Sequence, residues 1–165
     1  MHMFEERVDQ MTTDEVGRFE KLSRPSWLER MLGRKRIGEQ ADYTAKLVQV
    51  LEVSVEKCFV PKKTFDEENP LFILRIAEGK ALVLFGQWLY DPNIMAVSDR
   101  TFEAWKGQES FFSSFTLRRA VKSGTALKLH VHGNAFTPAE HLDLNTFFSE
   151  LRETQILSES DIVRK

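Results

Sequence analysis

The segment from Ser110 to Ala139 alternates apolar and polar residues, and it contains four basic residues but no aspartate or glutamate. Alternation in two runs, joined near Lys122, predicts a strand, a turn and a second strand. One predicted face carries Phe111, Phe115, Leu117, Leu127, Leu129 and Val131. The opposite face carries Phe112, Ser114, Thr116, Arg118, Lys128, His130 and His132. We expect the first face to build a core and the second to offer positive charge.

The charged side of this hairpin is the first candidate site. A turn centred near Lys122 would set Thr116 opposite Lys128 and Ser114 opposite His130, which groups hydroxyls with cations as an anion site does. The alternative is a solvated outer face whose charges keep the sheet edge from pairing with other chains. We use the name basic hairpin face for the predicted surface formed by Arg118, Lys128, His130 and His132.

Composition restricts the classes of protein to which the chain can belong. Its 165 residues suit one domain, and 23 basic against 25 acidic residues give a net charge of -2. A dedicated nucleic-acid binder would need a strong positive field, so no sequence-specific nucleic acid is expected as a partner. Cys58 is the sole cysteine, which excludes an internal disulfide and fits a reducing, cytoplasmic location. Neither a signal peptide nor an apolar run long enough to cross a bilayer is recognised.

Two capping-box spacings occur near the N-terminus, at Thr12 with Glu15 and at Ser26 with Glu29. They predict two short helices, and the second runs into the basic segment Arg34, Lys35 and Arg36. With its apolar face and its cations, that helix could make weak peripheral contact with an anionic membrane, or it could pack on the sheet.

Five further elements are predicted along the chain. Residues 71–77 and 80–90 read as strands joined by a tight turn at Gly79, with the second strand covered on both faces. Residues 43–60 fit both a helical stripe and strand alternation, and extended structure is favoured after Val50. A further strand is predicted from Thr101 to Trp105. The sequence Thr-Pro-Ala-Glu from Thr137 predicts the start of a helix that lies across the sheet.

Together these elements predict an α+β fold. We expect an antiparallel sheet or partly open barrel of about five to seven strands, with short N-terminal helices and a C-terminal helix packed on the sheet. The predicted division of the chain is an N-terminal helical segment with the basic stretch at 1–42, one α+β domain at 43–157 and a tail at 158–165.

His130 and His132 raise a second hypothesis, a metal-dependent enzyme. Alternate positions on a strand place both imidazoles on one side, and Glu140 or His141 could complete a site through the fold. Lys128 lies on the same predicted face and would repel a cation, so surface histidines without a metal are the favoured interpretation.

No catalytic motif occurs in the sequence, which favours a non-catalytic intracellular binding module without a cofactor. The expected partner is an anionic group, such as a phosphate or lipid headgroup, or a protein. The residues expected to bind it are Arg118, Lys128, His130, His132, Arg34, Lys35 and Arg36. A third hypothesis is a homo-oligomeric subunit that buries an aromatic surface containing Trp105 and Phe112 in a homodimer.

Overall fold

The computed structural model of the protein describes residues 4–17, 46–61, 70–142 and 152–158, and these form two sheets. The first sheet has the order β1 (Phe4–Gln10), β2 (Leu47–Ser54), β8 (Ser114–Ala120), β9 (Ala126–Val131) and β6 (Met95–Ala96). The second has the order β11 (Thr154–Ser158), β5 (Lys80–Phe85), β4 (Leu71–Ala77), β3 (Lys57–Pro61), β10 (Phe136–Leu142) and β7 (Ser110–Phe112). A 3-10 helix, η1 (Gln87–Tyr90), and an α-helix, α4 (Asp99–Trp105), lie between strands.

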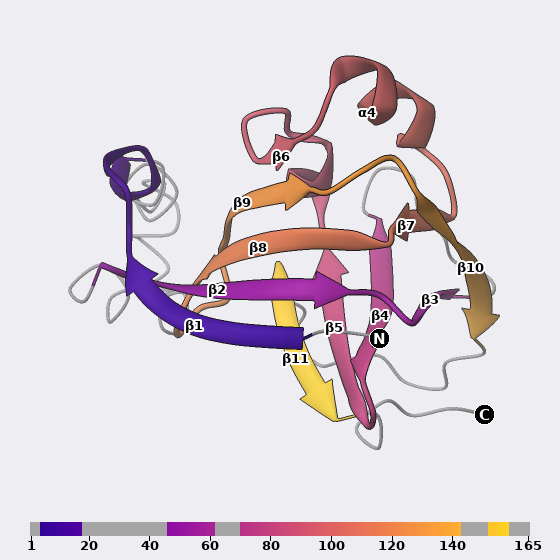
Figure 1. The fold of residues 1–165 in the computed structure, drawn as a ribbon, viewed down its shortest axis with the longest axis horizontal. Coiled ribbons are helices and arrows are strands. Elements are labelled where there is room, and N and C mark those ends of the chain that lie inside the picture. Colours follow the sequence, from indigo (N-terminus) through magenta and orange to yellow (C-terminus); the bar gives the residue numbers. More distant parts are fainter. Residues whose placement is uncertain (1–3, 18–45, 62–69, 143–151, 159–165) are drawn as a thin grey trace, which may run out of the picture.

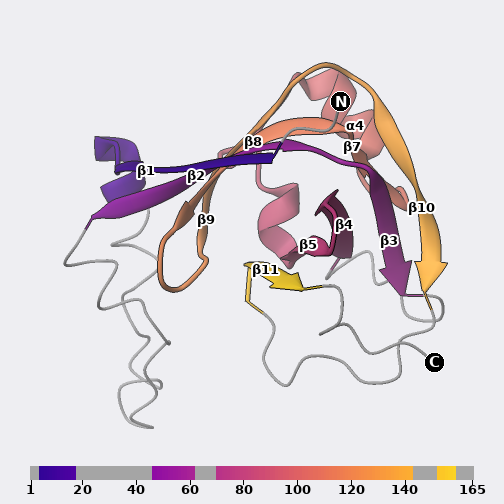
Figure 2. The same ribbon diagram turned by 60° about the horizontal axis from the view of Figure 1, so that its bottom comes forward.

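The two sheets form two layers, and the chain passes from one to the other where β2 is followed by β3 (Figure 1). Turned on its side, the molecule shows β1, β2, β8 and β9 as one curved layer above β4, β5 and β11, with β3 and β10 descending along one side (Figure 2). Only residues 55–56 separate β2 from β3, so the chain passes directly from the first sheet into the second.

The main core fills the space between these layers. Leu51, Phe115 and Leu117 from the first sheet meet Phe72 and Leu84 from the second, and each is fully buried. Strands β4 and β5 are covered on both faces, because a second cluster containing Ile73 and Val83 lies on the other side of the same strands. Burial of apolar surface at this scale is the main stabilising contribution to a domain of this size.

The fold is sheet-rich, with few helices and a curled, mixed arrangement of strands. The β4–β5 hairpin was predicted correctly, and Gly79 in its turn has a φ of 72°. The antiparallel-only sheet is not confirmed, because β10 pairs parallel with β3 and β6 pairs parallel with β9. No helix in the described ranges is long and apolar enough to cross a membrane.

Two boundaries and the type of one element differ from the predicted ones. Extended structure begins at Leu47 rather than after Val50 and is divided into β2 and β3. Strand β5 ends at Phe85, because Gly86 has a φ of 114° and turns the chain into η1. The prediction of a strand from Thr101 to Trp105 is wrong, because this segment belongs to α4. The residue that caps the first turn of α4 comes before the predicted strand.

That capping residue is Ser98, whose hydroxyl accepts a hydrogen bond from the backbone N–H of Thr101. The helix buries Trp105, which is 1% exposed and packs against four phenylalanines and a tyrosine. Phe112 is fully buried in the same cluster. The predicted aromatic dimer surface at Trp105 and Phe112 is therefore wrong, since both side chains belong to the core.

The predicted helix from Thr137 is not confirmed. Residues 136–142 form β10, which pairs with β3 on one side and with β7 on the other. The remainder of that prediction, residues 143–151, lies outside the described residues, as do the second N-terminal helix and the segment Arg34–Arg36.

The capping box at Thr12 and Glu15 is confirmed. Glu15 N–H donates to Thr12 Oγ1 at 3.2 Å, and Thr12 N–H donates to Glu15 Oε1 at 2.9 Å, at the start of a helix over residues 13–17. Strand β1, immediately before this helix, was not predicted from the sequence.

Strand β11 closes the second sheet at β5 and is held by the residue that precedes it. The carbonyl of Glu153 accepts hydrogen bonds from the backbone N–H of Phe85 at 3.0 Å and from Nε1 of Trp88 at 3.3 Å. Its carboxylate accepts the N–H of Ala126 at 2.9 Å. One residue near the C-terminus thus connects the second sheet to the start of β9 in the first.

Candidate functional site

The hairpin predicted between Ser110 and Ala139 exists as β8 and β9, paired antiparallel, with the predicted alternation over most of its length. Its register is shifted by two residues from the predicted one. Thr116 lies opposite His130, not Lys128, and Arg118 lies opposite Lys128. A shift of two preserves which face each side chain occupies, so Thr116, Arg118, Lys128 and His130 stay on the polar face with new neighbours. Phe112, also predicted for this face, lies in β7 and is buried in the core.

A β-bulge corrects the predicted position of Leu127. Arg118 pairs with Lys128 whereas Arg119 pairs with Ala126, which leaves Leu127 as the extra residue in β9. Leu127 was predicted to share the core face with Leu129, but it packs with Val48, Val50 and Ala120 on the opposite face. We call this the outer face of the first sheet. The apolar side chains of this face are buried, and its polar side chains lie next to them.

Arg118 does not offer a free positive charge to this face. Its Nε and Nη2 donate hydrogen bonds to the two carboxylate oxygens of Glu15, each at 2.9 Å. The side chains are 16% and 7% exposed. Burial favours the neutral carboxyl, but hydrogen bonds from Arg118 and Thr12 outweigh this and lower the pKa of Glu15 below its ordinary value. The same hydrogen bond raises the pKa of Arg118.

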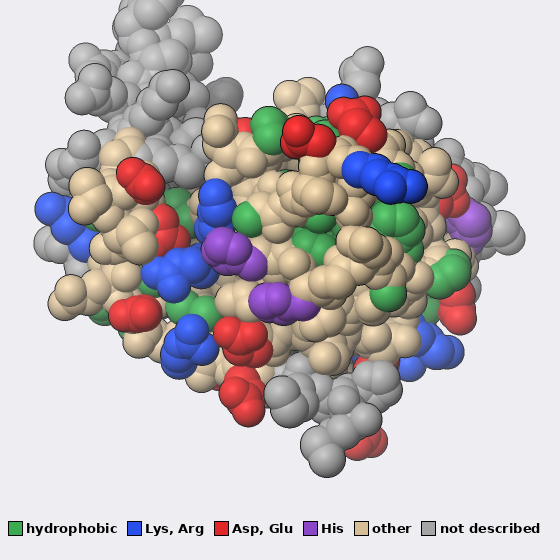
Figure 3. Space-filling view, turned by 45° about the horizontal axis from the view of Figure 1, so that its top comes forward, with side chains coloured by type: hydrophobic (Ala, Val, Ile, Leu, Met, Phe, Trp, Pro, Cys, Tyr) green, Lys and Arg blue, Asp and Glu red, His purple; other side chains and the backbone are tan. Residues whose placement is uncertain are grey.

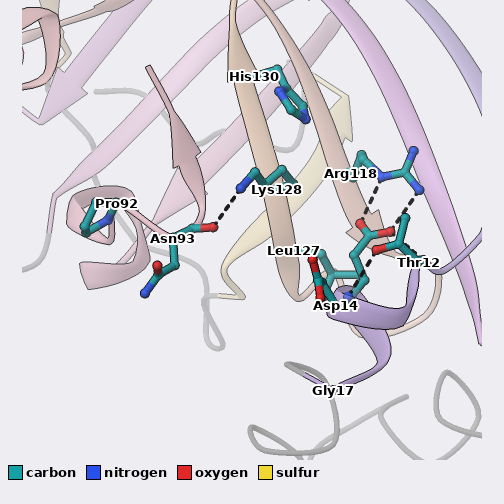
Figure 4. Close-up of a pocket in the computed structure, with 10 residues that line it drawn as sticks. Thr12, Asp14, Gly17, Pro92, Asn93, Arg118, Leu127, Lys128 and His130 are labelled. Atoms are coloured by element: carbon teal, nitrogen blue, oxygen red, sulfur yellow. Dashed lines mark hydrogen bonds and ion pairs between the residues drawn. The ribbon is translucent and has the colours of Figure 1, made fainter. Parts of the chain in front are cut away.

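A cavity of about 650 Å³ opens over this part of the outer face. In Figure 4, the loop of Pro92 and Asn93 lies on one side of the cavity, and the helix that bears Asp14 lies on the other. Lys128 and His130 project from β9 between them. The cavity is lined by Thr12, Asp14, Glu15, Gly17, Pro92, Asn93, Arg118, Leu127, Lys128 and His130.

Charges of both signs line the cavity, and Lys128 is the cation best placed to meet a ligand there. Its Nζ donates to the backbone carbonyl of Asn93 at 3.0 Å, which fixes the ammonium at the cavity wall. Burial, with the nearby charge of Lys128, lowers the pKa of His130, so its imidazole is neutral at pH 7 and carries one N–H donor. Figure 3 shows basic, acidic and histidine side chains interspersed on one face of the molecule.

His132 belongs to a different set of contacts. Its Nε2 lies 2.7 Å from the hydroxyl of Thr116, and that hydroxyl donates to Glu52 at 2.8 Å. His141, the other proposed ligand, is hydrogen-bonded to Glu109. Among the described residues, no three His, Cys, Asp or Glu side chains are arranged to hold a metal ion, so the metal-enzyme hypothesis gains no support from geometry.

The structure therefore brings together two of the predicted residues, Lys128 and His130, at one cavity wall. Arg118 lies beside them with its charge paired, and His132 does not line the cavity. The sequence prediction missed Asp14 and Asn93 as lining residues. The capping box had identified Glu15 as the start of a helix, but nothing in the sequence indicated a partner 103 residues away.

Comparison of the chain with protein-family models, with curated proteins and with solved structures finds no match in any of the three.

Proposed function

We propose that the protein is a non-catalytic binding module that takes a compact anionic group, of the phosphate or carboxylate type, at the Lys128 and His130 wall of the outer-face cavity. The observation that carries the proposal is this juxtaposition: an ammonium and an imidazole N–H on one strand, facing a space large enough for a small ligand. A concave site of this kind binds a small group better than a flat protein surface would.

The ion pair between Glu15 and Arg118 supports the proposal by rigidifying the cavity. It ties the helix over residues 13–17 to β8, so one wall is fixed before any ligand arrives. Binding to a preformed wall avoids part of the entropy cost of ordering side chains. The hydrogen bond from Lys128 to Asn93 restrains the ammonium in the same way.

The acidic residues of the cavity set the expected strength and selectivity. Asp14 and Glu15 balance Arg118 and Lys128 in formal charge, so an anion is held by local contacts and not by a net positive field. We expect weak binding that decreases with salt. Asp14, exposed at the rim, opposes an anion, and its neutralisation should strengthen binding.

Calorimetric titration with inorganic phosphate tests the proposal through two opposite effects. Lys128→Ala should weaken binding about tenfold or more, because a charge-assisted hydrogen bond is lost. Asp14→Asn should strengthen binding about threefold. Lys57→Ala is the matched control, since Lys57 lies on β3 and contacts Glu140 away from the cavity. If Lys128→Ala binds phosphate as tightly as the wild-type protein, Lys128 does not hold the anion and the proposal is wrong.

Two further titrations distinguish an anion carried by a protein partner from an anion carried by a lipid. A short phosphopeptide presents an anionic phosphate on a peptide chain, and vesicles containing phosphatidylserine present anionic headgroups on a membrane. Affinity for the peptide that exceeds the affinity for phosphate would identify a protein partner. Affinity confined to the vesicles would identify a lipid headgroup. The absence of salt-dependent binding in all three titrations would refute the proposed function.

A further inference from the structure

Strand β1 forms one edge of the first sheet. Within the described residues it pairs with β2 alone, through the seven positions from Phe4 to Gln10. Every residue from 5 to 10 is exposed, even though the strand is regular along its whole length. Figure 1 shows β1 as the outermost strand of its layer. An edge of this length presents a row of backbone donors and acceptors to another chain.

The hydrogen bonds at the end of β1 determine which backbone groups face outwards. Met11 N–H donates to the carbonyl of Lys46 at 2.9 Å, directed towards the β2 side. Backbone groups alternate between the two sides of a strand, so Glu6 and Val8 direct their N–H and C=O away from β2. Gln10 does the same with its N–H, whereas its C=O accepts a hydrogen bond from Nη2 of Arg118 at 3.4 Å. Consistent with this, Gln10 N–H donates to the side chain of its neighbour Asp9 at 2.8 Å.

Val8 marks the centre of this edge. It is 60% exposed and is the one exposed large hydrophobic side chain among the described residues. Its own N–H and C=O are among the outward-facing groups. A valine with free backbone groups at the middle of an exposed strand suits antiparallel pairing with another strand, because aliphatic side chains opposite each other bury apolar surface.

The charges along β1 favour one particular occupant, a second copy of the same strand. Antiparallel pairing about a two-fold axis at Val8 places Val8 opposite Val8, Arg7 opposite Asp9, and Glu6 opposite Gln10. The axis at Glu6 would oppose two glutamates, and the axis at Arg7 would oppose two arginines. An axis at Asp9 would oppose two aspartates. The register centred on Val8 is the one among these four with opposite charges paired and no like charges opposed.

We propose that the protein forms a two-fold homodimer in which β1 pairs antiparallel with β1 of a second copy, with Val8 at the axis. The first sheet then continues across the dimer through both edge strands. Arg7 is available for the exchange, because its contact with Glu52 is long, 3.4 Å, and its side chain is 58% exposed. Asp9 exchanges its hydrogen bond to Gln10 N–H for the partner's arginine.

Sedimentation velocity over a concentration series from micromolar to millimolar tests the proposal. The contact is a single strand pair, so we expect a weak dimer whose population rises with concentration. Arg7→Asp alone sets two aspartates opposite each other, and Asp9→Arg alone sets two arginines opposite each other, so each variant should be monomeric. Equimolar mixing of the two variants restores opposite charges at both positions and should recover a heterodimer.

Recovery of a dimer on mixing excludes a folding defect as the cause of the monomeric state, because a misfolded variant would not pair with the other variant. Val8→Pro gives a second test: it removes an outward-facing N–H and should abolish the dimer while the bonds to β2 remain. A wild-type protein that stays monomeric to millimolar concentration overturns the proposal. So does a dimer that persists in both charge variants, which would place the interface elsewhere.

Discussion

The ion pair between Glu15 and Arg118 should make a large and measurable contribution to stability. Arg118→Met leaves the Glu15 carboxylate, 7% exposed, without its partner, and we expect a loss of about 3 kcal/mol in the free energy of unfolding. Glu15→Gln leaves the Arg118 guanidinium without its carboxylate partner, but this group is 16% exposed and better solvated. The glutamine keeps an amide oxygen that can accept the hydrogen bond from the Thr12 N–H. Its expected cost is about 2 kcal/mol, the range for a hydrogen bond to a charged group.

A double-mutant cycle isolates the interaction from these separate costs. The double variant Glu15→Gln/Arg118→Met should cost about 3 kcal/mol, no more than the larger single change, because it leaves no buried charge uncompensated. The coupling energy is then about 2 kcal/mol. Urea unfolding followed by the fluorescence of Trp88 and Trp105, both buried, supplies the four free energies.

The pH dependence of the coupling has a defined sign. The folded-state pKa of Glu15 lies below its ordinary value, so its stabilising contribution is complete above the unfolded-state pKa of about 4.3. The contribution is lost as pH falls from there through the lower folded-state pKa. Wild type and Glu15→Gln should therefore converge in stability in acid. A coupling energy below about 0.5 kcal/mol at pH 7 would show that the pair behaves as an ordinary surface contact and would refute the reasoning.

Three further substitutions and one chemical modification have equally definite expectations. Gly79→Ala should cost about 1 kcal/mol from its φ of 72° alone. Gly124→Ala should cost at least about 1 kcal/mol more in urea unfolding, because its Cβ would also overlap the carbonyl of Thr154; equal costs would contradict this. Burial raises the pKa of the Cys58 thiol to about 12, so a thiol reagent at pH 8 should react only on unfolding, and prompt reaction with folded protein would contradict burial. Ser98→Ala should cost about 1 kcal/mol through loss of the α4 cap, measured by thermal unfolding, and an unchanged midpoint would show that the cap is dispensable.

The features that the sequence predicted correctly are those that depend on interactions between residues close together in the chain. Alternation identified the two strands of the basic hairpin and the faces of Arg118 and Lys128, because side-chain period follows directly from extended backbone geometry. The capping box at Thr12 was found for the same reason, since its hydrogen bonds join residues three apart. The turn at Gly79 was found because that position requires a positive φ.

The features that the sequence did not predict depend on contacts between residues far apart in the chain. Thr137 and Pro138 form a good helix start, yet they lie in β10 because β3 and β7 supply partners on both sides. The bulge at Leu127 moves one side chain to the other face without any change in composition that marks it. Glu15 neutralises Arg118 across 103 residues, so the free charge expected on the basic hairpin face was overstated.

The position of β11 has a consequence for how the protein is made. Ribosomes deliver the chain from the N-terminus, so β5 and the start of β9 emerge before Glu153, the residue that ties them together. Until then β5 is an unprotected edge with apolar side chains on both faces, a template for association with other nascent chains. Final assembly is therefore a late event in biosynthesis. A fragment that stops at residue 152 should accumulate in inclusion bodies to a greater extent than the full-length chain.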